Sequence, residues 1–134
     1  MLFALLLLQL AASAAMTGVI WMVQIAIYPL FARLEGKTFD DYHTQYMTRV
    51  TYVIAPLMFI EATCCAACLY LGDWQRMLPS TLLLATIWSS TALIQVPKHA
   101  KLTPETVQAL VRSNWIRTIA WTVRTVLLIL MAFA

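Results

Sequence analysis

Glu61 and Arg124 are charged residues that stand in the middle of long apolar stretches of the sequence. An isolated charge in hydrocarbon costs about 3 kcal/mol on membrane-insertion scales, so both residues need partners. We therefore expect the two side chains to meet as an ion pair inside the folded chain. There, Glu61 is the candidate catalytic proton acceptor, and Arg124 is the candidate cation that holds its charge state and stabilises an enolate-like oxygen. A clamp that only fixes the register of two helices is the alternative interpretation.

Polar and aromatic residues recur at helical spacing on two further segments. Near the C-terminus the spacing is i, i+3, i+7 and i+10, and the residues are Asn114, Arg117, Trp121 and Arg124. Near the N-terminus the spacing is i, i+3 and i+7, and the residues are Trp21, Gln24 and Tyr28. Each set falls on one face of a helix. We expect the two faces to line an amphipathic cleft that binds a hydrophobic aromatic molecule, with the two tryptophans as its walls.

Ser90 completes the candidate ligand-binding residues, because counting along the apolar stretches places it at the same depth as Gln24. At about 1.5 Å per helical residue, both lie about 10 Å from one end of their helices, and Glu61 and Arg124 lie about 15 Å from it. We expect Gln24 or Ser90 to accept the hydrogen bonds that a single carboxylate leaves unused on the Arg124 guanidinium.

The two histidines, His43 and His99, are weak candidates for a metal or haem site. Two imidazoles over a helical bundle could hold a haem or a transition metal. Neither histidine lies in an apolar span, and neither has a second histidine three or four residues away. A solvated position at the membrane surface is therefore the favoured interpretation, and no motif indicates a haem, a quinone or any other cofactor.

The elements that position these residues follow from the composition. Hydrophobic residues make up 62% of the 134 residues and charged residues only 11%, with a mean hydropathy of +0.79. A soluble domain carries about 25% charged residues, so a soluble protein is excluded. The sequence predicts an all-α polytopic membrane protein, a single domain over residues 1–134. Four transmembrane helices in an antiparallel bundle are expected at about residues 5–32, 51–71, 79–96 and 114–133.

The segments between these spans carry the local signals for helix boundaries. Residues 38–50 are polar with interleaved aromatics, which predicts a short interfacial helix after the first span or the lower end of the second span. We expect Pro97 to stop the third span, and Thr103 with Pro104 to begin the last helix as N-cap and first residue. Residues 1–15 resemble a secretory signal but lack a basic start, so we expect them to be retained in span one.

Loop charges predict the topology. The first and third connections hold most of the basic residues, namely Arg33, Lys37, Arg49, Lys98, Lys101 and Arg112. The second connection holds only Arg76, so the positive-inside rule places the first and third connections in the cytoplasm and both termini outside, or in the periplasm. The net charge of +3 is scattered rather than gathered in a stripe, which excludes nucleic acid as a partner.

The last third of the chain resembles a known family. The stretches VPKHAKL and RSNWIRTIAWTVRTVLLILMAF are similar to the C-terminal half of the anthrone-oxygenase-like family of small four-span bacterial membrane proteins of unknown function. The matching positions are Val96, Pro97, Leu102, Trp115 or Trp121, Arg124 and Thr125, and a first helix ending in Tyr28-Pro29. The resemblance implies a four-helix bundle in the bacterial inner membrane and, for some relatives, oxidation of an aromatic polyketide. The chain departs from the family at His99, where a small polar residue is expected.

Together these observations favour a membrane protein with a polar cleft inside the bilayer that binds a hydrophobic aromatic small molecule, such as a quinone, polyketide or tetrapyrrole. An oxidoreductase or oxygenase-like activity is compatible with this prediction, and whether the protein is an enzyme stays open. The alternative is a non-catalytic accessory subunit of a larger membrane complex, or a homo-oligomer. A proton-coupled transporter built on Glu61 is a third hypothesis, which lacks the support of an inverted repeat.

Overall fold

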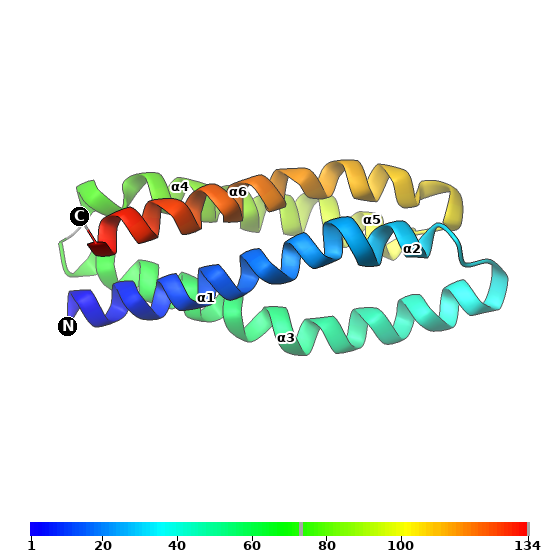
Figure 1. Ribbon diagram of the computed structural model, residues 1–134, viewed down its shortest axis with the longest axis horizontal. Coiled ribbons are helices and arrows are strands. Elements are labelled where there is room, and N and C mark those ends of the chain that lie inside the picture. The colour runs from blue at the N-terminus through cyan, green and yellow to red at the C-terminus, as the bar shows by residue number, and fades with distance from the viewer. Residues whose placement is uncertain (73, 134) are drawn as a thin grey trace.

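Four long rods arranged in an antiparallel bundle make up the protein in the computed structural model, which describes residues 1–72 and 74–133 (Figure 1). Within these ranges the chain is all α-helical, as the sequence predicts, and contains no strand. The four rods are residues 2–31, 36–70, 74–100 and 104–133. The first and third rods each pack against the second and the fourth, so the four rods form a square in cross-section. The elements, in chain order, are α1 (Leu2–Met22), η1 (Val23–Ile27), α2 (Tyr28–Phe31), α3 (Gly36–Tyr70), α4 (Trp74–Ser90), η2 (Thr91–Gln95), α5 (Val96–Ala100), η3 (Pro104–Thr106) and α6 (Val107–Phe133).

Each rod is long enough and apolar enough to cross a membrane. In the described part of the chain the four candidate spans contain 30, 35, 27 and 30 residues. At about 1.5 Å per residue these helices are about 40 to 52 Å long, which exceeds a hydrocarbon layer of about 30 Å. Their ends therefore reach into the lipid headgroup regions. The fold is that of a multi-pass membrane protein.

The segment 38–50 is the first part of α3 rather than a separate interfacial helix, so the second of the two expectations for it is the one observed. The helix begins after an extended residue, Glu35, and its first residue, Gly36, has a left-handed φ of +53° that glycine adopts without strain. Pro56 is accommodated inside the helix. The polar and aromatic side chains of the segment thus belong to one continuous rod.

The first and third rods share an irregularity that the sequence analysis did not predict. Each contains a π-helical turn, η1 or η2, followed by a proline, Pro29 or Pro97, at the second residue of the next helix. Proline lacks an N–H group and crowds the preceding turn, and a wider turn before it relieves that conflict. The expectation that Pro97 stops the third span is therefore wrong, because the helix continues to Ala100.

The start of the last helix is as predicted. Thr103 is the N-cap and Pro104 the first residue, and the side chains of Thr103 and Thr106 form a reciprocal capping box. This box satisfies backbone N–H groups that have no partner within the helix. The cap makes a sharp connection between α5 and α6.

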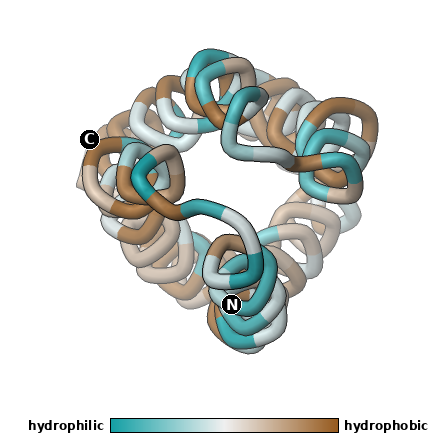
Figure 2. Tube along the Cα trace, turned by 90° about the vertical axis from the view of Figure 1, so that its right-hand side faces the viewer, coloured by the Kyte–Doolittle hydropathy of each residue, from teal (hydrophilic) through white to brown (hydrophobic). Residues whose placement is uncertain are grey.

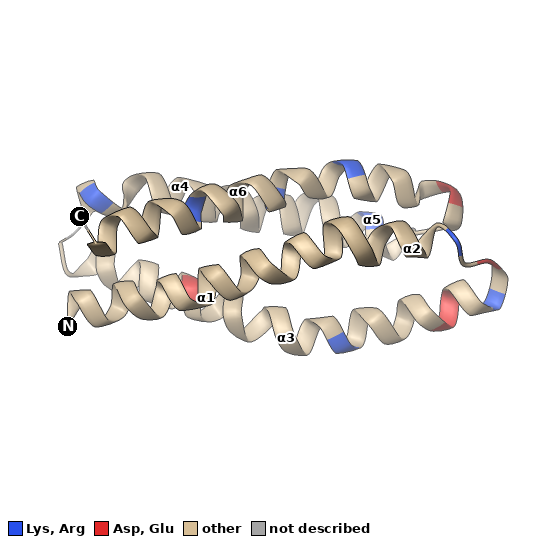
Figure 3. Ribbon diagram, viewed as in Figure 1, with Lys and Arg blue, Asp and Glu red and all other residues tan. Residues whose placement is uncertain are grey.

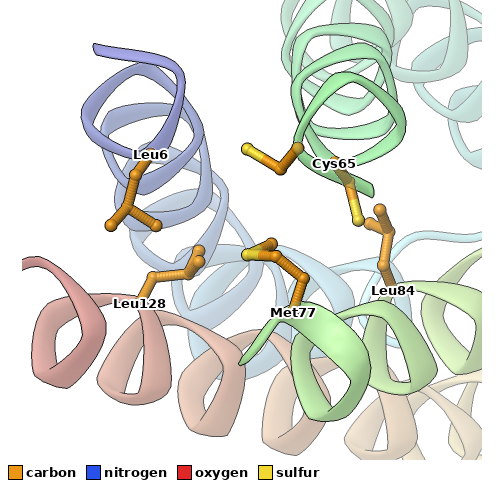
Figure 4. Packing of buried hydrophobic residues seen from close by; sticks show 6 residues of the cluster. Leu6, Cys65, Met77, Leu84 and Leu128 are labelled. Carbon is orange, nitrogen blue, oxygen red and sulfur yellow. The ribbon is translucent and has the colours of Figure 1, made fainter. Parts of the chain in front are cut away.

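Three apolar clusters fill the bundle from one end to the other. Figure 4 shows the cluster nearest the chain termini, where Leu6, Leu84 and Leu128 meet Met77 and Cys65. All three cysteines, Cys64, Cys65 and Cys68, are buried, and the last two belong to this cluster, where they pack against apolar side chains. The middle cluster contains Trp121 and the third contains Tyr28, Phe31 and Phe39. The third cluster is the aromatic one.

Charged residues lie mostly toward the end of the bundle where the connections from α2 to α3 and from α5 to α6 run (Figure 3). The view along the bundle from that end shows hydrophilic residues on the nearest turns and connections (Figure 2). We call this the basic end. Arg76 lies toward the opposite end, in α4. Among the described residues, three charged side chains are buried within the bundle instead, those of Glu61, Arg117 and Arg124.

Candidate functional site

The expected ion pair between Glu61 and Arg124 forms. Both side chains are fully buried, and Nη1 of Arg124 donates a hydrogen bond to Oε1 of Glu61. Nε of Arg124 donates to the backbone carbonyl of Ser80 at 3.3 Å. The pair therefore joins α3, α4 and α6 in the half of the bundle nearer the chain termini.

The leftover donors of Arg124 are not satisfied as the sequence analysis expected. Gln24 and Ser90 do not contact this guanidinium through any hydrogen bond found in the described residues; its partners are Glu61 and Ser80. Gln24 lies further along the bundle, because it is positioned by α6 residues two to three turns before Arg124. Counting residues along each span gives a depth for each side chain, but it does not determine the register between helices.

Trp121 connects this ion pair to the rest of the interior. Its indole Nε1 donates a hydrogen bond to Oε2 of Glu61 at 3.0 Å, and its side chain is fully buried. Trp121 also lines a cavity, whereas Glu61 and Arg124 do not. The Glu61 carboxylate has a donor on each of its oxygens.

A second buried arginine lies two turns away on the same face of α6. Nε and Nη2 of Arg117 donate to Oδ1 of Asn114 at 3.0 and 2.5 Å, and Nη1 donates to Oγ1 of Thr91 at 3.4 Å. Asn114 in turn donates to Oε1 of Gln24 at 2.8 Å. In the part of the chain that the structure describes, Arg117 has no carboxylate within ion-pair distance. Its charge is met only by neutral oxygens.

Arg117 and Trp121 line a cavity of about 130 Å³ at the junction of all four rods. The lining is apolar toward the middle of the bundle and polar toward the basic end. Side chains of α1, η1 and α3 supply much of the apolar part, among them Met16, Ile20, Val23, Val50 and Ile54. The polar lining residues are Tyr28, Tyr46, Thr51, Thr91, Gln95, His99 and Arg117. The cavity is therefore amphipathic along the bundle axis.

The cavity opens on the side of the bundle between α3 and α5. Thr51 on α3 and Val96 on α5 line it, and both are exposed on the outer surface. α3 makes few close backbone contacts with η2 and α5, whereas it packs closely against α1. Thr51 and Val96 therefore mark the side on which the cavity reaches the outer surface of the bundle.

His99 and His43 meet at the polar end of the cavity, although 56 residues separate them in the sequence. Nε2 of His43 lies 3.1 Å from Nδ1 of His99, and the two rings are stacked with an interplanar angle of 9°. Nε2 of His99 lies 2.9 Å from the hydroxyl oxygen of Tyr28. Three helices, α2, α3 and α5, therefore contribute to one hydrogen-bonded chain.

The predicted ligand-binding residues divide between the cavity and its surroundings. Tyr28, Arg117 and Trp121 line the cavity, and Asn114 with Gln24 positions Arg117 from behind. The inward stripe on α6 is confirmed, because all four of its members are buried. Ser90 is buried without a hydrogen-bond partner in the described residues and lies outside the cavity lining, as do both members of the ion pair.

Trp21 lies on the outside of the bundle. Its indole Nε1 donates to Thr122 at 3.0 Å, its ring packs edge-on against Trp115, and 37% of the residue is exposed. It does not line the cavity, so it is not a wall of the cleft. The π-helical turn after Met22 shifts the helix register by a fraction of a turn, which explains why Trp21 and Tyr28 do not share a face as ideal helical spacing predicts.

Sequence reasoning missed three polar residues of the cavity and placed one in the wrong setting. Tyr46, Thr51 and Thr91 were not singled out, and His99 was expected in a solvated position but is only 8% exposed. A signal for the burial of His99 existed, since it lies four residues after Gln95 and therefore on the same helix face. The assumption that the span stops at Pro97 concealed it.

In the described residues, no group of three or more histidine, cysteine, aspartate or glutamate side chains is arranged to hold a metal ion. Comparison with family models, with curated proteins and with solved structures gave no match. The geometry of the cavity and of its polar end is therefore the basis for assigning a function.

Proposed function

We propose that the protein binds a hydrophobic aromatic small molecule in the cavity, with an oxygen atom of the ligand beside Arg117. The observation that carries this proposal is a buried guanidinium that borders an apolar cavity and, within residues 1–72 and 74–133, has no acid partner. A buried charge is stabilised by each further hydrogen bond to an electronegative atom. A carbonyl or hydroxyl oxygen on an aromatic ring supplies that atom, and the ring fills the apolar part.

The cavity volume limits what can be enclosed. At about 130 Å³ it is similar in size to a cavity of about 150 Å³ that holds a benzene ring in another protein. One aromatic ring therefore fits inside, and any longer apolar substituent must extend past Thr51 and Val96 into the bilayer. A quinone or a phenolic compound with an apolar tail satisfies this requirement, whereas a tetrapyrrole such as haem is too large for the enclosed space.

The setting we propose is the bacterial inner membrane, with the basic end in the cytoplasm and both termini outside. The clustering of Lys and Arg at one end of the bundle supports this orientation. The resemblance of residues 96–133 to the anthrone-oxygenase-like family supports an aromatic, oxygen-bearing ligand and an oxidoreductase or oxygenase-like use of it. Within this proposal Glu61 and Arg124 hold the bundle together, and the groups around the cavity contact the ligand.

The test is to purify the protein in a mild detergent and to identify bound small molecules by absorption spectroscopy and mass spectrometry. A larger side chain in the cavity lining should displace the bound small molecules. We expect Val50→Phe, a half-buried position in the lining, to lower the ratio of extracted ligand to protein about tenfold, which corresponds to about 1.4 kcal/mol. The matched control is Val53→Phe, one turn along the same helix, where the valine is 51% exposed and outside the lining.

Equal loss of ligand in both variants would contradict binding in this cavity. A wild-type protein that carries no stoichiometric ligand but copurifies with a stable larger partner would favour the second interpretation, a non-catalytic subunit of a membrane complex. That outcome would also contradict the ligand proposal, because the cavity would then be a packing feature of the isolated chain.

A further inference from the structure

We propose that Tyr28, His99 and His43 form a proton relay between the cavity and the basic end of the bundle, and that the ligand carries an aromatic hydroxyl group that gives up its proton there. This inference rests on the proposed function and names its substrate class. The relay is a site distinct from the Glu61 and Arg124 pair, because neither member of that pair lines the cavity.

The relay has a continuous path with the correct geometry. The hydroxyl of Tyr28 lies 2.9 Å from Nε2 of His99, and Nδ1 of His99 lies 3.1 Å from Nε2 of His43. Each imidazole has one nitrogen facing each neighbour, so it can accept a proton on one side and release one on the other. Tyr28 and His99 are 2% and 8% exposed and line the cavity, whereas His43 is half-buried and does not line it. The path therefore runs from the cavity outward.

The relay is held in place by aromatic packing. The ring of His43 stacks on Phe39 with an interplanar angle of 13° and meets Phe31 edge-on, both at centroid distances of 6.0 Å. Tyr28 packs against Phe31 and Tyr46. These contacts fix the ring orientations that proton transfer requires.

The charges around the relay suit removal of a proton from the ligand. The groups that face it are Asp40, one turn before His43 on α3, Tyr46 on α3, and Arg117 on α6. Arg117 borders the cavity and stabilises a negative charge on the ligand oxygen. Burial of the His43 imidazole disfavours a positive charge on it, and Asp40, at the outer end of the path, offsets part of that cost with its negative charge. Arg117 therefore favours a negative charge at the cavity end of the relay, and Asp40 favours a positive charge at the outer end.

The step balances without an oxidant or reductant. The O–H bond of the ligand breaks, its proton goes to the hydroxyl oxygen of Tyr28, and the Tyr28 proton goes to Nε2 of His99. The proton on Nδ1 of His99 then moves to Nε2 of His43. The electron pair of the broken bond stays on the ligand oxygen beside Arg117, so the products are an aromatic oxyanion and a protonated His43. The proton stays on His43, one turn from Asp40 on the same helix.

The experiment uses 4-nitrophenol, whose anion absorbs visible light and whose neutral form does not, and its methyl ether 4-nitroanisole, which has no proton to give. Both are titrated into the full-length protein in detergent at a pH where free 4-nitrophenol is mainly neutral. We expect bound 4-nitrophenol to show the anion spectrum with the wild type. His43→Gln should lower the ratio of anion to neutral form of the bound compound about tenfold, equivalent to one pH unit. Gln45→Ala, an exposed position on the same helix, should leave that ratio unchanged.

The two compounds distinguish the relay from the binding proposal. If neither binds the wild type, the proposed function is overturned. If both bind and 4-nitrophenol stays neutral, or if His43→Gln yields as much anion as the wild type, the relay is overturned and the binding proposal stands. Binding of 4-nitroanisole also reports that the His43→Gln variant is folded, and His43→Asn replaces that variant if it does not bind the ether.

Discussion

Arg117 and Arg124 are the same residue type, two turns apart on the same buried face of α6, yet their surroundings differ completely. Arg124 is paired with a carboxylate and enclosed between an apolar cluster and Trp121. Arg117 has only neutral hydrogen-bond partners and borders a cavity that opens toward lipid. An enclosed, neutralised charge supports the fold, whereas a buried charge without an acid partner is available to a ligand.

The position of Trp121 explains how the two regions coexist. The indole donates a hydrogen bond to Glu61 and also lines the cavity, which neither member of the ion pair does. In the proposed function, the half of the bundle near the termini supports the fold, and the half near the basic end holds the ligand.

The largest effect should come from breaking the enclosed pair. Arg124→Leu leaves a buried carboxylate without its cation, and we expect it to lower the free energy of unfolding by about 3 kcal/mol. The double variant Glu61→Leu with Arg124→Leu should recover much of that loss. Unfolding in mixed micelles of a mild detergent and sodium dodecyl sulfate measures both, and additive losses in the double-mutant cycle would contradict the coupling.

The next effect should come from the residue between the two regions. Trp121→Phe removes the indole N–H that Glu61 accepts, and we expect a loss of about 2 kcal/mol in the free energy of unfolding because a hydrogen bond to a charged group is lost. Trp115→Phe on the same helix, where the residue is 39% exposed, is the control and should change stability by less than about 0.5 kcal/mol. Similar losses for the two variants would mean that Trp121 contributes only its bulk.

The smallest effect on stability should come from Arg117. Arg117→Gln removes a buried charge that has no acid partner, so we expect the free energy of unfolding to change by less than about 1 kcal/mol. Affinity for a bound aromatic ligand should nevertheless fall about tenfold, or about 1.4 kcal/mol. Ligand titration by fluorescence measures the affinity, with the exposed Arg112→Gln as the control. A loss of stability as large as that of Arg124→Leu would contradict the proposal that Arg124 supports the fold while Arg117 serves the ligand.

The sequence predicts much of the fold and part of the site. The scarcity of charged residues and the length of the apolar stretches determine a four-helix membrane protein, because these properties depend on local composition. The contact between Glu61 and Arg124 can be predicted equally well from the sequence. A charge in hydrocarbon needs a partner, and each of these residues has one oppositely charged residue at a similar depth. The inward face of α6 follows from helical spacing alone.

What only the tertiary structure decides is which residues meet across helices and where the packing leaves space. The π-helical turns before Pro29 and Pro97 rotate the residues that follow them. Tyr28 therefore does not share a helix face with Trp21, and His99 points inward. The approach of His43 to His99, and the opening between α3 and α5, arise from the relative register and tilt of separate rods. Register between helices depends on the sum of many weak contacts, and no single residue or spacing in the sequence encodes that sum.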